Sequence, residues 1–248
     1  MLAGRTALVT GAGSGIGRAV SLRLDALGAS VVGIGRRAER LAETAALAGE
    51  RFRYEVLNVR DPEAAAFVRS LGGLDLLVNN AGGQFVAPTE KISRRGFDAV
   101  LDLNLTALAS LIRAARPGLV ERQGRVVNLS LSSPERGIAG LSHSAAARAG
   151  VAELTKALAG QWRSDGIRLF CLAPGTVLTA GVGDELPPDV LKHIVRTTPL
   201  GRDTSLVEVA EWVAALGAGV ADSVSGALIE LDGGSGLVSA ASLTGGPA

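Results

Sequence analysis

The sequence predicts a single α/β domain over residues 1–248, built on a doubly wound parallel sheet of seven strands flanked by helices. Strand-like and helix-like segments alternate along the whole chain, and a glycine-rich loop at residues 10–17 joins the first strand to the first helix. The chain is 47% hydrophobic and 20% charged, so it can bury a large core. It carries no linker, repeat or low-complexity segment, which favours one domain.

The first half of the chain alternates regularly between apolar and amphipathic segments. A short apolar strand leads into the glycine-rich loop, and the amphipathic helix behind it ends at Gly28. The run at 74–79 is almost continuously apolar, as in a strand buried on both faces of a sheet. We expect strands over residues 7–9, 30–35, 51–59 and 74–79, and helices over residues 18–27, 38–47 and 62–71.

The second half continues the alternation with two long helices and one irregular stretch. Between 175 and 203 the pattern breaks at Pro187, Pro188 and Pro199, and residues 176–203 are expected to cover the substrate. Parallel sheets of this kind bind ligands at the carboxyl ends of their strands. We expect strands over residues 124–131, 167–172 and 227–231, and helices over residues 94–116, 142–162 and 206–216.

Composition argues against several classes of partner. The formal net charge is +1 and there is no basic block, which argues against nucleic acid. No run of 18 apolar residues occurs, so a membrane span is not expected. Residues 1–4 lead straight into the first strand, so a signal segment is not expected either, and a cytoplasmic location is predicted. Cys171 is the only cysteine and His143 and His193 the only histidines, so neither a disulfide nor a metal site is expected.

The loop at residues 10–17, Thr-Gly-Ala-Gly-Ser-Gly-Ile-Gly, has the features of a dinucleotide-binding turn. Gly11 permits a tight turn, and Gly15 and Gly17 let the backbone approach a pyrophosphate at the helix N-terminus. Unpaired N–H groups and the helix dipole favour an anion there. A glycine turn that binds nothing is the alternative, but the order strand, loop, helix favours binding.

This loop, together with Asn79-Asn80-Ala81-Gly82 and Pro174-Gly175, resembles the short-chain dehydrogenase/reductase family over essentially the whole chain. The resemblance implies a Rossmann-type fold, a nicotinamide cofactor and a homotetramer packed through the two long helices. In that family the first loop holds the pyrophosphate, the Asn-Asn-Ala-Gly turn lies by the adenine-side ribose, and Pro-Gly precedes the nicotinamide. The cofactor-binding residues implied here are Gly11, Ser14, Gly15, Ile16, Gly17, Arg36, Arg37, Asn58, Val59, Asn80, Ala81, Gly82, Arg148, Pro174, Gly175, Val177 and Thr179.

The end of the second expected strand favours NADPH over NADH. NAD enzymes place a carboxylate there for the ribose 2′-hydroxyl, whereas NADP enzymes place arginine for the 2′-phosphate. Here Arg36 and Arg37 follow Gly35, with no acid before Glu39. A guanidinium fork suits a doubly charged phosphate. The alternative is a solvated basic helix start.

The expected active site departs from the family pattern, which is an asparagine, a serine after the fifth strand, and Tyr-x-x-x-Lys on the next helix. Asn104 matches the asparagine, and counting back from residues 149–151 places Ser144 and Arg148 at the tyrosine and lysine positions. Leu131 falls where the serine is usual, and a shift of one residue would restore Ser132. The candidate catalytic residues are therefore Asn104, Ser132, Ser144 and Arg148.

The missing tyrosine is confirmed by composition, because Tyr54 is the only one and belongs to the third expected strand. Residues 79–88 and 143–150 resemble the peroxisomal trans-2-enoyl-CoA reductases of the same family, which also carry serine and arginine on this helix. Ketone reduction needs a proton almost as the hydride arrives. Reduction of an enoyl thioester gives an enolate that hydrogen-bond donors alone can stabilise.

The leading hypothesis is therefore an NADPH-dependent reductase that reduces the C=C bond of an enoyl thioester, a small-molecule substrate. One alternative is a carbonyl reductase or alcohol dehydrogenase with an altered site using Ser132 or His143, and another is a cofactor-binding protein without redox turnover. His143 follows Ser142 and precedes Ser144, so it should point about 100° away from the face of Ser144. A packed or substrate-pocket histidine is expected there. Ser132 is either a substrate-oxygen donor or a strand-end cap.

Overall fold

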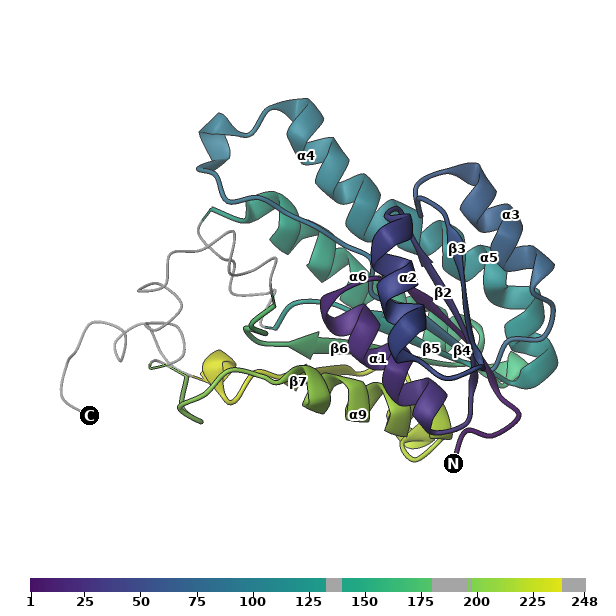
Figure 1. Cartoon of the computed structure of the whole chain (residues 1–248). Coiled ribbons are helices and arrows are strands. Elements are labelled where there is room, and N and C mark those ends of the chain that lie inside the picture. Colours follow the sequence, from purple (N-terminus) through teal and green to yellow (C-terminus); the bar gives the residue numbers. More distant parts are fainter. Residues whose placement is uncertain (133–139, 180–195, 197, 238–248) are drawn as a thin grey trace.

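The computed structural model describes residues 1–132, 140–179, 196 and 198–237, which form one three-layer α/β domain (Figure 1). Seven parallel strands run in the order β3-β2-β1-β4-β5-β6-β7, which confirms the predicted sheet. Strand order reverses between β1 and β4, so a crevice is expected at their carboxyl ends. The strands are β1 Thr6–Thr10, β2 Ser30–Gly35, β3 Phe52–Val56, β4 Leu76–Asn79, β5 Arg125–Leu129, β6 Arg168–Pro174 and β7 Leu228–Leu231.

Helices cover both faces of the sheet. On one face α1 (Gly15–Ala26) packs against α9 (Leu206–Ala218), with α2 (Ala38–Leu47) beside α1. On the other face α3 (Pro62–Ser70) packs against α5 (Ala107–Arg122), and α4 (Arg94–Leu101) against α6 (Ser142–Gln161). Short 3-10 turns occur at Thr89–Lys91, Arg163–Asp165, Asp222–Val224 and Ser235–Leu237.

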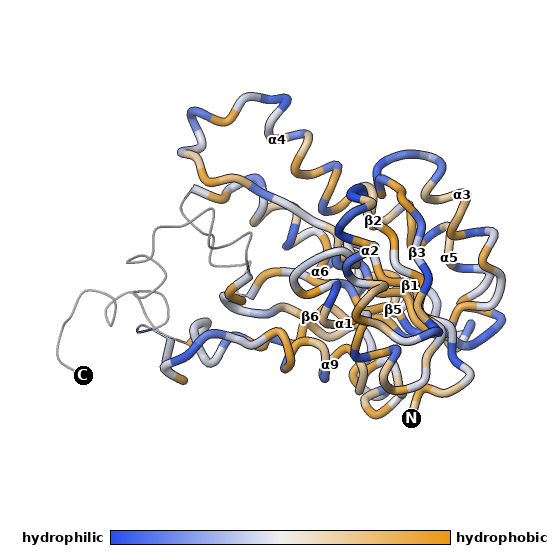
Figure 2. The backbone as a smooth tube through the Cα atoms, in the orientation of Figure 1, coloured by the Kyte–Doolittle hydropathy of each residue, from blue (hydrophilic) through white to orange (hydrophobic). Residues whose placement is uncertain are grey.

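The five central strands contribute side chains to two hydrophobic cores, one on each face of the sheet, whereas the edge strands β3 and β7 contribute to one core only. In β1, Ala7 and Val9 join the core under α1 and α9, whereas Leu8 joins the core under α3 and α5. Alternate side chains therefore both meet apolar neighbours, which explains why the strands are apolar without interruption. Figure 2 shows the central strands as mostly hydrophobic, whereas β3 at the sheet edge carries hydrophilic residues.

The helix expected over residues 94–116 differs in two ways. It is interrupted by a π-helical turn at Asp102–Thr106, so that α4 and α5 are separate helices. It also continues past the expected end to Arg122 with Pro117 inside it. Proline removes one backbone hydrogen bond, but Leu119 beyond it is fully buried, so packing favours continuation of the helix.

Several other boundaries shift by a few residues. The strand expected over 51–59 ends at Val56, because the chain then leaves the sheet edge. Of the expected substrate cover at 176–203, residues 180–195 and 197 lie outside the described residues.

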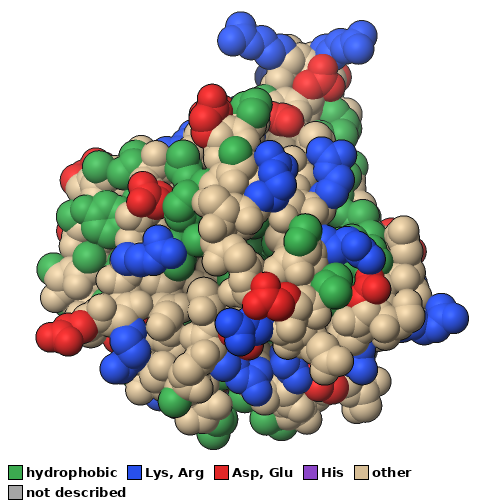
Figure 3. Space-filling view, turned by 90° about the vertical axis from the view of Figure 1, so that its right-hand side faces the viewer, with side chains coloured by type: hydrophobic (Ala, Val, Ile, Leu, Met, Phe, Trp, Pro, Cys, Tyr) green, Lys and Arg blue, Asp and Glu red, His purple; other side chains and the backbone are tan. Residues whose placement is uncertain are grey.

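No described helix is long and apolar enough to cross a bilayer. The face in Figure 3 carries basic and acidic side chains side by side, without a continuous basic field. That face therefore offers no obvious electrostatic footprint for nucleic acid.

Candidate functional site

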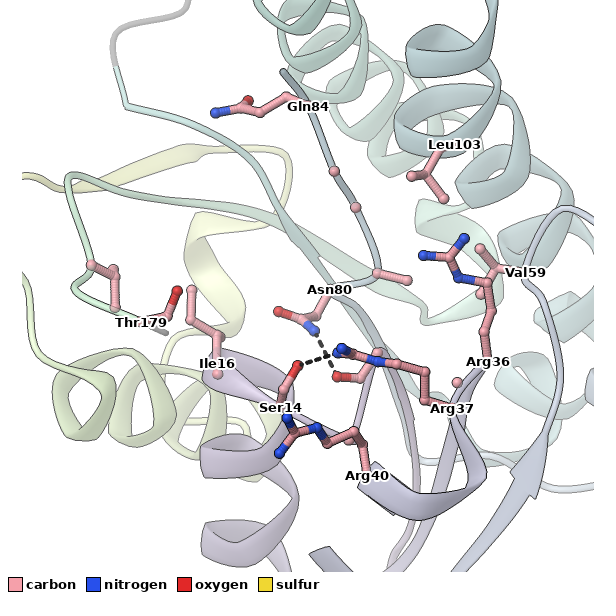
Figure 4. Close-up of a pocket in the computed structure, with 18 of the residues that line it drawn as sticks. Ser14, Ile16, Arg36, Arg37, Arg40, Val59, Asn80, Gln84, Leu103 and Thr179 are labelled. Atoms are coloured by element: carbon pink, nitrogen blue, oxygen red, sulfur yellow. Dashed lines mark hydrogen bonds between the residues drawn. The ribbon is translucent and has the colours of Figure 1, made fainter. Parts of the chain in front are cut away.

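A long cleft opens at the carboxyl ends of the strands, where the strand order reverses (Figure 4). Every residue predicted to bind a cofactor lines this cleft except Gly17. Arg37 and Arg40 lie at one end of the view and Gln84 at the other. The cleft is lined by Gly11, Gly13, Ser14, Gly15, Ile16, Gly35, Arg36, Arg37, Arg40, Leu41, Leu57, Asn58, Val59, Asn80, Ala81, Gly82, Gly83, Gln84, Leu103, Ser130, Leu131, Arg148, Pro174, Gly175, Val177 and Thr179.

The glycine loop is shaped to bring backbone close to a ligand. Gly11 and Gly15 have φ of +70° and +50°, a region that side chains disfavour. Gly17 lies behind the loop, because a Cβ there would stand 2.2 Å from the Gly11 carbonyl oxygen. Helix α1 begins at Gly15, its Ser14 cap makes no side-chain cap bond, and its first turn has no acid. Its N-terminal N–H groups are therefore suited to bind an anion.

Thr10 and Asn80 fasten this loop to the end of β4. The Thr10 hydroxyl accepts from the backbone N–H of Asn80 at 2.9 Å and of Ala81 at 2.8 Å. The Asn80 side-chain amide donates to the Thr10 carbonyl at 2.9 Å. The side chain of Asn80 therefore holds the two adjacent walls of the cleft in one arrangement.

Three arginines lie at the basic end of the cleft, and one of them has no hydrogen-bond or ion-pair partner among the described residues. Arg37 donates to the Ser14 hydroxyl at 3.3 Å, and Arg40 pairs with Glu43 at 3.1 Å. Hydrogen bonds from Arg18 and Arg40 lower the pKa of Glu43, so it remains a carboxylate. Within the described part of the chain, Arg36 makes no hydrogen bond or ion pair. Its guanidinium is therefore available to an anionic ligand.

Asn58 lies at the start of the turn into α3. Its side-chain amide donates to Asp61 at 3.0 Å, and its side-chain oxygen accepts from the Arg60 backbone at 3.3 Å. The amide orientation is thus fixed from within its own turn. The oxygen keeps a second lone pair for a ligand donor.

Asn104 sits in the π-helical turn, is 1% exposed, and does not line the cleft. Its amide donates at 2.8 Å both to the Gly83 carbonyl and to the Val100 carbonyl. Its oxygen accepts from the Gly83 N–H at 3.2 Å. Asn104 therefore braces the loop after β4.

Arg148 places a fixed positive charge beside this loop. Its Nη1 donates to the Leu129 carbonyl at 2.8 Å, and a Cβ added to Gly82 would stand 2.6 Å from its Nη2. Burial lowers the pKa of Arg148 to about 10, so it stays cationic at neutral pH. The charge sits at the end of β5, where the cleft wall is formed by Ser130 and Leu131.

Ser144 is fully buried and does not line the cleft. Its hydroxyl donates to the side-chain oxygen of Gln84 at 2.5 Å, and Gln84 does line the cleft. Ser132 is likewise not a lining residue; its backbone N–H donates to the Pro174 carbonyl at 3.3 Å. Ser130 lines the cleft instead, and its hydroxyl donates to the Arg148 carbonyl at 3.1 Å.

His143 is sealed in an aromatic pocket. It is fully buried, with the Phe85 ring centroid 4.4 Å away and that of Phe97 6.4 Å away. Neither ring nitrogen has a hydrogen-bond partner in the described part of the chain, and burial lowers the pKa of His143. It does not line the cleft, and neither does its neighbour Ser144, so the expected difference in direction between the two is not seen as a difference in access to the cleft.

The remaining reactive side chains are remote or inert. Tyr54 lies in β3, paired with Gly33. Cys171 is buried, and burial raises its pKa to about 11, so it is a poor nucleophile.

Several lining residues were not predicted. Arg40 follows Arg37 by three residues on one helix, and that spacing could have indicated it. Ser130 lies two residues before Ser132, and a count along the chain did not distinguish them. Gln84 lies in an irregular loop and has no periodic signal. The unpredicted lining residues are Gly13, Gly35, Arg40, Leu41, Leu57, Gly83, Gln84, Leu103, Ser130 and Leu131.

Comparison with known proteins finds close similarity along nearly the whole chain. The sequence model of a family described as Enoyl-(Acyl carrier protein) reductase matches residues 11–236. A protein of Bacillus subtilis described as a probable 2,4-dienoyl-CoA reductase is 33% identical, with 93% of this chain and 96% of that one covered. A 3-oxoacyl-acyl-carrier-protein reductase of Vibrio cholerae is 32% identical, with 94% and 98% covered.

A solved structure extends the comparison to the fold. A candidate NAD(P)-dependent gluconate 5-dehydrogenase of Beutenbergia cavernae, with NADP bound at low occupancy, is 35% identical. It superposes with a TM-score of 0.87, covering 96% of this chain and 98% of that one. This neighbour thus shares the fold of the chain, and the three proteins differ in their named substrates.

Proposed function

The chain belongs to the short-chain dehydrogenase/reductase family of oxidoreductases, and from this we propose that it is an NADPH-dependent reductase of the C=C bond of an enoyl thioester. The observation that carries the proposal is the cleft's set of polar groups beside Arg148. It offers a fixed cation and hydrogen-bond donors, while the single tyrosine of the chain lies in β3.

The cleft fits a nicotinamide dinucleotide. The open N-terminus of α1 and the positive-φ glycines 11 and 15 suit a pyrophosphate. The uncommitted guanidinium of Arg36, with Arg37 beside it, suits a 2′-phosphate and supports NADPH over NADH. Pro174, Val177 and Thr179 line the opposite wall, where the nicotinamide is proposed to lie. NADPH, when bound, supplies a hydride.

The residues of the chain then have to stabilise charge on the substrate. Hydride addition at the β-carbon of an enoyl thioester moves negative charge onto the thioester oxygen, and water can later protonate the α-carbon. Arg148 stays cationic and supplies electrostatic stabilisation without transferring a proton. Asn104 holds the Gly83 backbone, and Ser144 holds Gln84, so both act behind the cleft wall.

A carbonyl reductase or alcohol dehydrogenase is the second candidate, favoured by the gluconate 5-dehydrogenase neighbour and by the Ser130 hydroxyl in the cleft. Such an enzyme must protonate an alkoxide as it forms, and removal of a general acid typically costs about 10²–10⁴-fold in rate. His143 and Ser132, the acids considered for it, do not line the cleft. A cofactor-binding protein without turnover is the third candidate.

We also infer a homotetramer assembled through α5 and α6, as the family resemblance implies. A groove between these helices is lined by the half-buried Leu154 and Leu158 beside Arg113, Arg116 and Asp165, so apolar and charged side chains share this face. Light scattering coupled to size-exclusion chromatography tests this: a mass near four times 25.1 kDa is expected, and a monomer would refute it.

The reaction is tested by kcat/KM with NADPH for matched trans-2-enoyl and 3-ketoacyl thioesters. We expect enoyl reduction to be at least about tenfold faster, because the ketone transition state alone needs the missing acid. Faster ketone reduction would establish the second candidate. NADPH binding without turnover of either class would establish the third.

A further inference from the structure

Gln84 is a polar side chain of the cleft that is held in place from behind the cleft wall. Its loop is braced at the neighbouring residue, because Asn104 exchanges hydrogen bonds with the N–H and the carbonyl of Gly83. Its side-chain oxygen accepts from the Ser144 hydroxyl at 2.5 Å. Ser144 itself is fully buried and cannot reach a ligand directly. The backbone and the side chain of Gln84 are thus both positioned by groups outside the cleft.

This arrangement leaves the two N–H bonds of the Gln84 amide without a partner in the described part of the chain. Because the oxygen is held by Ser144, the amide cannot rotate to present its acceptor without losing that bond. Figure 4 shows Gln84 at the end of the cleft opposite Arg40. The cleft therefore presents an oriented neutral donor at its substrate end.

We propose that Gln84 donates a hydrogen bond to the carbonyl oxygen of the substrate, and that Ser144 is the positioning residue that holds the Gln84 amide in that orientation. The inference rests on the proposed function, since it assigns the donor for the thioester oxygen. Arg148, on α6, lies beside Gly82, which is two residues before Gln84 in the loop after β4. A cation and a neutral donor therefore both adjoin this loop of the cleft wall. Two such donors can hold an enolate oxygen without giving up a proton.

The test uses the full chain, with Gln84→Ala, Gln84→Glu, Ser144→Ala and Ser144→Thr. Loss of one oxyanion donor lowers kcat by about 10²–10³-fold in known cases, so a loss of at least about tenfold is expected for Gln84→Ala. Gln84→Glu should lose more, because a carboxylate repels the developing charge. Ser144→Ala should lower kcat less, and Ser144→Thr, which keeps the hydroxyl, should restore it. NADPH affinity should stay within about twofold in all four, measured by fluorescence titration.

Thr89→Ala is the matched control, because it removes another hydrogen bond between this loop and α6, the one from the Thr89 hydroxyl to Ser142 at 3.0 Å. Thr89 does not line the cleft, so kcat should stay within about twofold. A Gln84→Ala variant whose kcat is also within twofold overturns the proposal. So does a Ser144→Ala loss that Ser144→Thr fails to restore.

Failure of the Gln84 proposal can be distinguished from failure of the proposed function. Should the wild-type protein reduce neither thioester class, the proposed function fails, and Gln84 is judged by titrating saturated acyl-CoA into the NADP-loaded protein. At least fivefold weaker binding in Gln84→Ala, with Thr89→Ala unchanged, then supports the donor role. Equal affinities, or no binding by the wild type, overturn it.

Discussion

Gly17→Ala tests how tightly the glycine loop is built. A Cβ at this position would lie 2.2 Å from the Gly11 carbonyl oxygen and 2.5 Å from the Asn80 amide nitrogen, whereas real Cβ contacts stay beyond 3.0 Å. The Gly11 contact is with backbone, so the turn itself must move by about 0.8 Å. That movement disturbs the bond from the Gly11 N–H to the Ile34 carbonyl at 2.8 Å and the tie from Asn80 to Thr10.

We expect a cost of about 2–4 kcal/mol, from overpacking of about 1–3 kcal/mol and one weakened hydrogen bond of about 1 kcal/mol. For a chain of this size that lowers Tm by about 5–15 °C. NADPH affinity should also fall at least about tenfold, since the distorted turn carries the proposed pyrophosphate site.

The matched control is Gly160→Ala, an exposed position in α6 where a Cβ meets nothing within 4 Å. It should leave affinity unchanged and raise stability by about 0.5 kcal/mol. Thermal unfolding and fluorescence titration measure both effects. If Gly17→Ala melts within about 2 °C of the wild type and binds NADPH equally well, the close approach seen at Gly17 does not constrain the loop.

Three further predictions concern single side chains. Arg36→Ala should weaken NADPH binding by about ten- to a hundredfold, since a charge-assisted contact contributes about 1.5–3 kcal/mol, and leave NADH binding unchanged; equal wild-type affinities for both would contradict this. Arg148→Ala should lower NADPH affinity and turnover together, whereas His143→Ala should keep turnover within a few fold; a folded, NADPH-binding His143 variant without turnover would identify the histidine as the acid. Hydrogen bonds from Arg202 and from Ser205 lower the pKa of Glu208 to about 2, so its stabilising effect is complete above its ordinary pKa and is lost as pH falls through about 2. Both partners are exposed, so urea unfolding should show Glu208→Gln less stable by at most about 1 kcal/mol at pH 7 and equal near pH 2; a gap that does not change with pH would refute the assignment.

Local patterns predicted the regular elements closely and the irregular ones poorly. β2 and α2 have the predicted bounds, because an uninterrupted apolar run and an amphipathic helical pattern are signals carried by neighbouring residues. The π-helical turn at Asp102–Thr106 was not predicted, since it is stabilised by the contact of Asn104 with Gly83, twenty-one positions away. The passage of α5 through Pro117 likewise depends on tertiary packing.

The candidate site divides in the same way. The glycine loop and Arg36 follow from the sequence because one contiguous motif builds each of them. Ser144 was predicted as a residue of the site, but the structure buries it behind the cleft wall. Its hydrogen bond to Gln84 connects α6 to the loop after β4, and the two residues are 60 positions apart in the sequence. No spacing rule within a helix can reveal that pair. The proposed substrate end of the cleft therefore depends on the fold, whereas the proposed cofactor end can largely be predicted from local sequence.

The proposed stabilisation of an enolate oxygen depends mainly on Arg148. Its Nη1 is bound to the Leu129 carbonyl, and its own carbonyl accepts from Ser130, so the residue is tied twice to the end of β5. Its guanidinium stays charged at neutral pH and therefore cannot relay a proton to an acid beside it. The Asn104 amide is already occupied by Gly83 and Val100. The polar groups at and behind this part of the cleft wall are thus held in fixed positions, which supports the proposal that they stabilise a developing oxyanion rather than protonate an alkoxide.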